Sequence, residues 1–261
     1  MAGSDCSGGA GIQADLKAFS ANETFGMSVI TSVVAENTTR VLSVFNVPVE
    51  EIQKQIDAVF EDIHVDAVKL GMLPTAEIIS AVADKLNEYK PSIIVCDPVM
   101  VATSGDALSE GGTVSAMREK LFPIVTLLTP NIPEAEAISG LEIKNENHME
   151  EAARIIMDMG VKNVLVKGGH LTGDAVDYLC TPEGVHKLAC KRVDSPNTQG
   201  TGCTLSSAIT ANLAHGMDML SAVTKAKNYI TEAIEKSFTV GKGHSPVNHF
   251  YDYYDLKGTV L

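Results

Sequence analysis

The sequence predicts an α/β fold in which a mainly parallel central sheet lies between two layers of helices. Short runs of apolar and β-branched residues alternate with segments whose apolar residues recur at the helical period, and this alternation is typical of strand–helix–strand units. The chain has 261 residues, of which 45% are hydrophobic and 20% charged, which is enough to bury one large core. We therefore expect a single three-layer α/β/α domain over residues 1–261.

Five short runs have the near-continuous apolarity of strands that are covered on both faces. They occupy residues 27–35, 66–72, 92–97, 124–130 and 163–169. The first residues lead almost at once into a glycine-rich turn, so a strand before that turn would be a stub.

Amphipathic helices are predicted between and after these runs. Apolar residues recur near the helical period in three groups: Ile52, Ile56, Phe60 and Ile63; Ile78, Ile79, Val82 and Leu86; and Ala153, Ile156 and Met157. Residues 203–216 and 217–238 predict two further helices, and Gly216 fits a C-cap. Residues 175–193 break the alternation, because two strand-like pieces flank a Pro-Glu-Gly turn, and they predict a hairpin.

Composition narrows the possible functions. The formal net charge of −13 opposes binding to the phosphate backbone of nucleic acids but allows phosphate binding in a local pocket. No stretch has the length and apolarity of a membrane span, and the first residues lack an export-signal pattern. Five cysteines at unrelated spacings form neither a disulfide framework nor a zinc motif. We expect reduced thiols, a cytoplasmic protein, no nucleic-acid partner and no membrane partner.

A glycine-rich segment, GSDCSGGAGIQADLKAF at residues 3–19, precedes an amphipathic helix. Its glycines let the backbone approach a ligand closely, and the start of the helix offers unpaired amides. The spacing matches neither a dinucleotide fingerprint nor a P-loop. Asp5 lies among the glycines, where its carboxylate could accept hydrogen bonds from a polar ligand, so a binding turn is favoured over a mobile surface loop.

Charged residues follow three of the predicted strands, at the edge where parallel sheets bind ligands. Asp97 and Glu134 could together orient hydrated Mg²⁺, and Lys167 beside two glycines suits a nucleotide phosphate. Each has an ordinary structural alternative, namely a turn aspartate, a glutamate at a helix start and a solvated lysine. Taken without context, Lys225 and Lys227 in the last helix are expected at a water-facing edge.

The most specific feature is the stretch NTQGTGCTLSSA at residues 197–208. Gly200, Thr201 and Gly202 precede a helix that begins near Cys203, so successive amides can point at one anion while the helix dipole adds a favourable potential. The same field should lower the pKa of the Cys203 thiol and let it accept a proton. The alternative is a small buried residue that only packs beneath the loop.

Seven motifs occur in the order found in one enzyme family. They are GSDCSGGAGIQADLKAF, MSVITSVVAENT, KLGML, DPVMVATSGD, TPNIPEAE, VKGGHL and NTQGTGCTLSSA. With them the chain resembles, from residue 2 to about residue 254, the hydroxymethylpyrimidine/phosphomethylpyrimidine kinases of thiamin synthesis in the ribokinase-like superfamily. The resemblance implies a ribokinase-like fold, often homodimeric. It also implies transfer of the ATP γ-phosphoryl group to the hydroxymethyl group of an aminopyrimidine, and then phosphorylation of the monophosphate to the diphosphate.

The resemblance also implies roles for individual residues. An anion hole would be formed by Gly200, Thr201 and Gly202, with Cys203 in the place of the catalytic base. The pyrimidine pocket would contain Asp5, Gly11, Glu36, Met72 and Val101. Asp97 and Glu134 would form an acidic pair around Mg²⁺ and its waters, and the nucleotide or phosphate contacts would come from Lys167, Thr198 and Lys227. ATP and Mg²⁺ are the expected cofactors.

Two residues depart from the family pattern. Glu36 stands where many relatives have Gln, and an ionised carboxylate only accepts hydrogen bonds whereas an amide also donates them. Gln199 stands where His is frequent, beside the predicted anion hole. Two rival functions remain open: a pyridoxal kinase of the same superfamily, and a non-catalytic vitamin-precursor binder or thiol-based sensor.

Overall fold

The structure, a computed structural model, describes residues 1–100, 111–169 and 175–253. The strands are β1 Ala2–Asp5, β2 Ile30–Asn37, β3 Arg40–Asn46, β4 Val68–Leu70, β5 Ile94–Cys96, β6 Leu127–Leu128, β7 Val164–Val166, β8 Ala175–Thr181 and β9 Gly184–Cys190. The helices are α1 Gly11–Ala21, α2 Val49–Phe60, α3 Ala76–Tyr89, α4 Thr113–Ala116, a π-helical turn Met117–Leu121, a 3-10 turn Phe122–Ile124, α5 Ile132–Ser139, α6 Glu146–Asp158, α7 Thr201–Ala214 and α8 Met219–Glu235.

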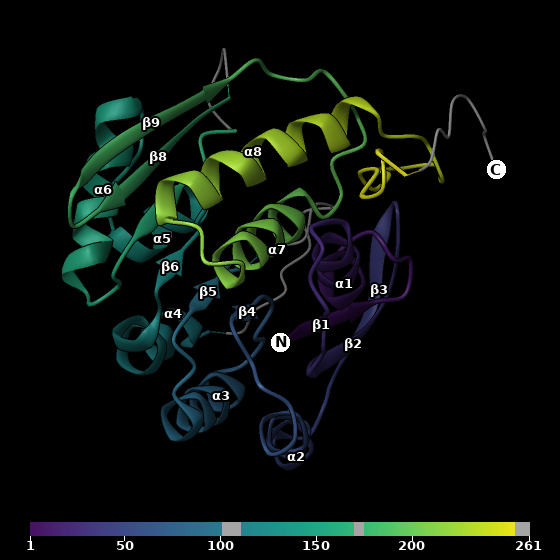
Figure 1. The fold of residues 1–261 in the computed structure, drawn as a ribbon, viewed down its shortest axis with the longest axis vertical. Coiled ribbons are helices and arrows are strands. Elements are labelled where there is room, and N and C mark those ends of the chain that lie inside the picture. Colours follow the sequence, from purple (N-terminus) through teal and green to yellow (C-terminus); the bar gives the residue numbers. More distant parts are fainter. Residues whose placement is uncertain (101–110, 170–174, 254–261) are drawn as a thin grey trace.

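The strands form two hydrogen-bonded sheets rather than the one that the sequence predicted. Their orders are β1-β2-β3 and β4-β5-β6-β7-β8-β9. The sheets meet at Met1, whose amino group donates to the carbonyl of Lys69 at 2.7 Å and whose carbonyl accepts from Gly71 at 2.9 Å. β1 therefore lies between β2 and the end of β4, and the two sheets are joined along one edge (Figure 1).

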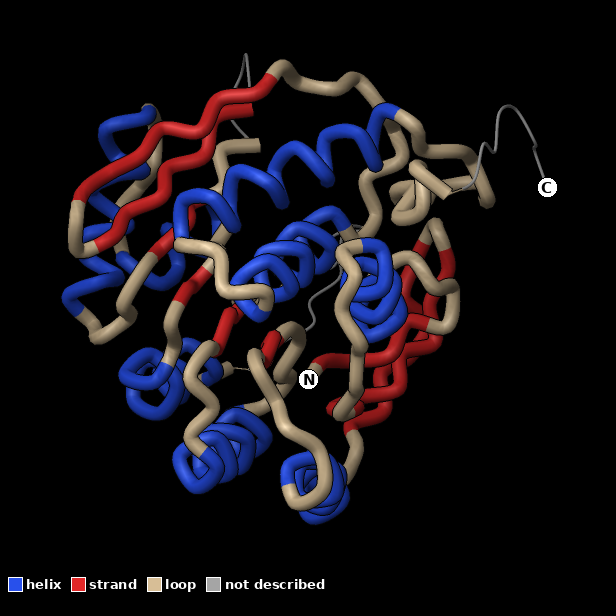
Figure 2. The backbone as a smooth tube through the Cα atoms, viewed as in Figure 1, coloured by secondary structure: helices blue, strands red, loops and turns tan. Residues whose placement is uncertain are grey.

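The six-stranded sheet is parallel from β4 to β7. β8 and β9 then pair antiparallel to form the predicted hairpin, which runs along the far edge of the sheet in Figure 2. Parallel strands need crossover connections, and the helices supply them. The prediction of a mainly parallel sheet with helices on both faces is confirmed.

β5, β6 and β7 supply side chains to both helical layers, because successive side chains of a strand point to opposite faces. Ile94 and Cys96 of β5 belong to a core with α2, α3, α5 and α6, whereas Val95 packs in a second core with α7 and α8. Figure 1 shows α7 and α8 on one side of β4, β5 and β6, and α3 and α4 on the other. This double burial explains the short, continuous apolar runs in the sequence.

Several predicted boundaries were wrong in informative ways. The run 124–130 contains only the two-residue β6, because the 3-10 turn Phe122–Ile124 occupies its start. α2 ends at Phe60, so Ile63 lies outside it and is 40% exposed. β3 was not predicted, because its side chains are mostly exposed and lack a buried strand's pattern. No helix in the described ranges is long and apolar enough to cross a membrane.

Candidate active site

A cavity of about 870 Å³ opens where β1, β4, β5 and β7 end. It is lined by all the predicted site residues that the structure describes: Asp5, Gly11, Glu36, Met72, Asp97, Glu134, Lys167, Thr198, Gly200, Thr201, Gly202, Cys203 and Lys227. Val101 lies outside the described residues. The structure thus gathers in one cavity residues that lie more than 200 positions apart, as expected for the carboxyl edge of a parallel sheet.

The N-terminus of α7 forms one wall of this cavity. Gly200 is the N-cap residue and has a left-handed backbone with φ of 73°. Its carbonyl accepts the first helical hydrogen bond, from the amide of Thr204 at 2.9 Å. Among the described residues, the amides of Gly202 and Cys203 have no acceptor. These two N–H groups and the helix dipole are therefore available to an anion in the cavity.

The glycine-rich turn packs directly against this helix start. A Cβ atom on Gly200 would lie 1.9 Å from the carbonyl oxygen of Gly9, so only glycine allows the contact. The side chain of Gln199 donates from Nε2 to Asp5 Oδ2 at 3.2 Å and to Ser7 Oγ at 3.2 Å. The glycine-rich turn and the loop before α7 are thus fixed to each other, and these are the loops predicted to hold the two substrates.

Asp5 organises the glycine-rich turn from within. Its carboxylate accepts hydrogen bonds from the amides of Ser7 at 2.7 Å, Gly9 at 2.9 Å and Ala10 at 2.7 Å, besides the one from Gln199. The side chain is 1% exposed. In the structure these oxygens accept hydrogen bonds from backbone amides of the turn, and the contact of Asp5 with a substrate stays a prediction.

Close backbone packing builds the end of the cavity where the sequence predicts the pyrimidine to bind. Gly11 has φ of 54°, and a Cβ atom there would lie 2.3 Å from the carbonyl oxygen of Gly3. Gly3 in turn packs against the sulfur of Met72, which is 6% exposed. Glu36 is half-buried in β2, where the pairing with β3 shifts register. These residues line a partly apolar part of the cavity that also includes the carboxylate of Glu36.

Three charged groups meet beside the helix start. Lys167 Nζ lies 2.7 Å from Asp97 Oδ1, which also accepts from Thr129 Oγ1 at 3.1 Å. A Cβ atom on Gly202 would lie 3.2 Å from Asp97 Oδ2 and 3.4 Å from Lys167 Nζ, so this cluster is in contact with α7. Burial, with the nearby Asp97, raises the pKa of Glu134 to about 7, although Lys167 opposes the shift.

Asp97 and Glu134 suit a hydrated Mg²⁺ better than a directly coordinated ion. Glu134 Oε2 already accepts from the amide of Asn131 at 2.8 Å in a capping box, and Asp97 Oδ1 is engaged by Lys167. No group of three acidic, histidine or cysteine side chains with metal-binding geometry occurs in the described part of the chain. Mg²⁺ commonly keeps several waters and binds one or two carboxylates plus substrate phosphates.

The expectation that Cys203 has a lowered pKa was wrong. Burial raises the pKa of its thiol to about 11, and the carboxylates of Asp15 and Asp97 add to this effect. Lys69 and a hydrogen bond from the backbone of Gly11 oppose it without reversing it. Because the loss of hydration outweighs the effects of Lys69 and of the Gly11 backbone, the thiol keeps its proton at neutral pH.

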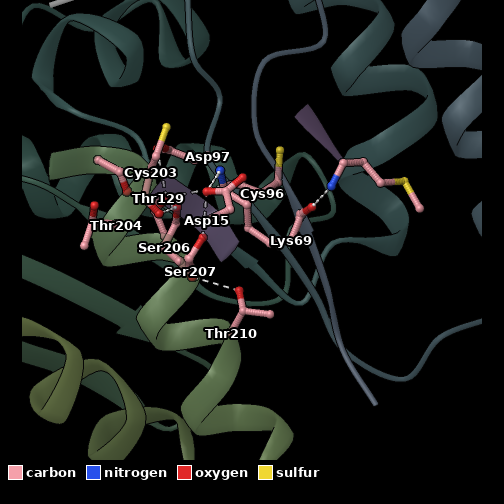
Figure 3. A network of polar contacts seen from close by, with 12 residues as sticks. Asp15, Lys69, Cys96, Asp97, Thr129, Cys203, Thr204, Ser206, Ser207 and Thr210 are labelled. Atoms are coloured by element: carbon pink, nitrogen blue, oxygen red, sulfur yellow. Dashed lines mark hydrogen bonds and ion pairs between the residues drawn. The ribbon is translucent and has the colours of Figure 1, made fainter. Parts of the chain in front are cut away.

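A buried ion pair that the sequence analysis missed lies beside Cys203. Lys69 Nζ is 2.7 Å from Asp15 Oδ1, with side chains 1% and 3% exposed, and Ser207 Oγ donates to the same oxygen at 2.7 Å. Figure 3 shows this cluster with Asp97 and Cys203 at its edge. The pair joins β4, α1 and α7. A lone lysine within the apolar run DAVKLGM was the signal that could have revealed it.

Lys227 is not at a water-facing edge. It is 7% exposed, lines the cavity and lies 2.5 Å from Asp177 Oδ2, whereas Lys225 on the same helix is exposed. Asp177 Oδ1 accepts from the amide of Gly168 at 2.9 Å. Asp177 was also missed, although a single acid within the apolar strand AVDYLC was a visible signal.

Comparison with known proteins gives a consistent result over nearly the whole chain. Residues 5–248 match the family model for phosphomethylpyrimidine kinase. The chain is 49% identical to the thiamine biosynthesis bifunctional protein ThiED of Geobacter sulfurreducens, over 98% of this chain and 53% of that protein, so it spans about half of that relative. It is 44% identical to the hydroxymethylpyrimidine/phosphomethylpyrimidine kinase of Haemophilus influenzae, over 96% of this chain and 95% of that one.

A solved structure supports the same fold. The ADP complex of Bacillus subtilis pyridoxal kinase has a TM-score of 0.89 and 40% sequence identity, covering 95% of each chain. Such close agreement along both chains confirms the predicted ribokinase-like architecture. The chain therefore shares its scaffold with a protein named as a pyridoxal kinase.

Proposed function

Because the chain belongs to the phosphomethylpyrimidine kinase family, we propose that it uses ATP to phosphorylate 4-amino-5-hydroxymethyl-2-methylpyrimidine and then its monophosphate, in thiamin biosynthesis. One observation carries the proposal. Within the described ranges the amides of Gly202 and Cys203 have no acceptor, and both residues line a cavity beside Lys167 and Asp97. A helix start next to a half-buried lysine, with 15% of its side chain exposed, is suited to a phosphoryl group during transfer.

The residues act mainly by position and charge. Phosphoryl transfer passes through a state with charge spread over the equatorial oxygens, so catalysis depends on placing donors and cations around them. The two amides and Lys167 supply that environment, while Thr198 and Lys227 contact the nucleotide. Mg²⁺, held through its waters by Asp97 and Glu134, would neutralise charge on the phosphates.

Cys203 guides the alcohol proton in this proposal. With a pKa of about 11, only about 0.01% of the thiol is ionised at pH 7, so a preformed thiolate does not start the reaction. The thiol lies instead between the amide of Gly11 and the start of α7, where its sulfur can accept a hydrogen bond from the substrate hydroxyl while that proton passes to an oxygen of the transferred phosphoryl group. The monophosphate needs no such help, because its attacking oxygen is already ionised.

The family's homodimer is part of the proposal. β2 and β3 present Val33, Leu42 and Phe45 with exposed fractions of 50%, 58% and 66%. A cluster of exposed large apolar side chains on adjacent strands is typical of a protein interface. We also propose that the chain forms a single kinase domain. A cytoplasmic location is part of the proposal, and it is supported by cysteines that are free throughout the described ranges.

A pyridoxal kinase is the second candidate, favoured by the structural match to the Bacillus subtilis enzyme. The experiment that separates the two incubates the protein with Mg·ATP and either the pyrimidine alcohol or pyridoxal, and follows product mass and turnover. We expect masses for one and then two added phosphates on the pyrimidine. Faster turnover of pyridoxal would favour the rival, and no ATP use with either alcohol would favour a binder or sensor.

A further inference from the structure

Asp177 stands beside the cavity as a buried negative charge at the end where the nucleotide is proposed to bind. It is 6% exposed and lines the cavity together with Lys167 and Lys227. A bare carboxylate there would repel a triphosphate. The ammonium group of Lys227, 2.5 Å from Asp177 Oδ2, neutralises that charge.

The carboxylate is fixed by the fold and not by the lysine. Its second oxygen accepts from the amide of Gly168 at 2.9 Å. A Cβ atom on Gly168 would lie 1.8 Å from the carbonyl oxygen of Val176, so the chain after β7 packs directly against β8. Asp177 is therefore a rigid anchor, while Lys227 is a long side chain that reaches it from α8.

We propose that Asp177 is a positioning residue that holds the ammonium group of Lys227 toward the nucleotide phosphates. The inference rests on the proposed kinase function and adds a residue to it. When a phosphate enters, the lysine shares its donors between the carboxylate and the phosphate. The pair thus provides a cation that is already oriented in the free protein.

Asp177→Asn should weaken ATP binding when Lys227 is present and strengthen it when Lys227 has been replaced by methionine. Asp177→Asn keeps an acceptor for Gly168 but loses the anchor, so ATP binding should weaken about tenfold, as for the loss of one charge-assisted contact. Lys227→Met removes the cation and exposes the carboxylate, so ATP binding should weaken about 100-fold. Adding Asp177→Asn to Lys227→Met removes the repelling charge and should restore affinity about tenfold.

Calorimetric titration with Mg·ATP and with adenosine, in the absence of any alcohol, tests this. Lys225→Met is the matched control, because Lys225 lies on the same helix but is exposed, and it should bind ATP like the unaltered protein. Adenosine affinity should stay unchanged in every variant, since only phosphates contact the pair. Thermal unfolding establishes that each variant is folded.

The proposal is overturned if the double variant binds ATP no more tightly than Lys227→Met, or if adenosine affinity falls in parallel with ATP affinity. Either result would make the pair a structural element only. Failure of the unaltered protein to bind ATP at all would instead contradict the kinase function, so the two failures are distinguishable.

Discussion

Gly200→Ala tests whether contact between the two loops is required for catalysis. Alanine at this position must adopt a left-handed backbone, which costs about 1–2 kcal/mol. Its Cβ atom would also lie 1.9 Å from the carbonyl oxygen of Gly9, and real Cβ contacts essentially never fall below 3.0 Å. The loops must therefore separate by about 1.1 Å, and a displacement of about 1 Å lowers the rate of an enzyme about 100-fold.

Gly216→Ala is the matched control for the backbone cost. Gly216 follows the other end of α7 with φ of 83°, and no atom lies within 4 Å of a Cβ placed there. Gly216→Ala should lose only this backbone cost in urea unfolding, and Gly200→Ala should lose at least as much, because its Cβ atom also meets Gly9. Only Gly200→Ala should lose about 100-fold in the single-turnover rate of the first phosphorylation. A Gly200→Ala enzyme as fast as Gly216→Ala would refute the role of the loop contact.

Three further outcomes are expected. Cys203→Ala should slow the first phosphorylation more than the second in separate single-turnover assays, and equal losses would contradict proton guidance. Lys69→Met leaves Asp15 buried without its cation and should lower the free energy of unfolding by about 3–5 kcal/mol, whereas replacing both partners with apolar residues should recover most of it in urea unfolding. Burial lowers the pKa of His249 from 6.5 to about 4, so the unfolded chain binds the proton first as the pH falls. The contribution of His249 to the free energy of unfolding should therefore fall by about 2 kcal/mol between pH 7 and pH 5. Urea unfolding of the unaltered protein and of His249→Gln at both pH values separates it from other titrating groups such as Glu134.

The pattern of apolar residues revealed the strands that are covered by helices on both faces. β5 and β7 read as continuous apolar runs because both of their faces are covered. β3 has no such signal, since its side chains are mostly exposed. The division into two sheets also escaped prediction, because hydrogen-bond partners between distant segments leave no mark in local sequence.

The site was predictable from sequence where a local motif fixes the backbone. It was not predictable where contacts with distant residues decide the ionisation or burial of a side chain. The glycines before Cys203 indicated a helix start facing a ligand, and the structure places it in the cavity. The thiol's ionisation could not be inferred in the same way, because it depends on burial and on charges at residues 15 and 97. Lys227 likewise owes its burial to Asp177, fifty positions earlier in the chain.

The central claim is that the start of α7 receives the phosphoryl group during transfer. A crystal structure of the protein with ADP, Mg²⁺, aluminium fluoride and the pyrimidine alcohol tests it most directly. We expect the planar fluoride group within about 3 Å of the amide nitrogens of Gly202 and Cys203, with Lys167 on its other side. A fluoride group bound elsewhere, or amides at residues 202 and 203 that face away from it, would contradict the account.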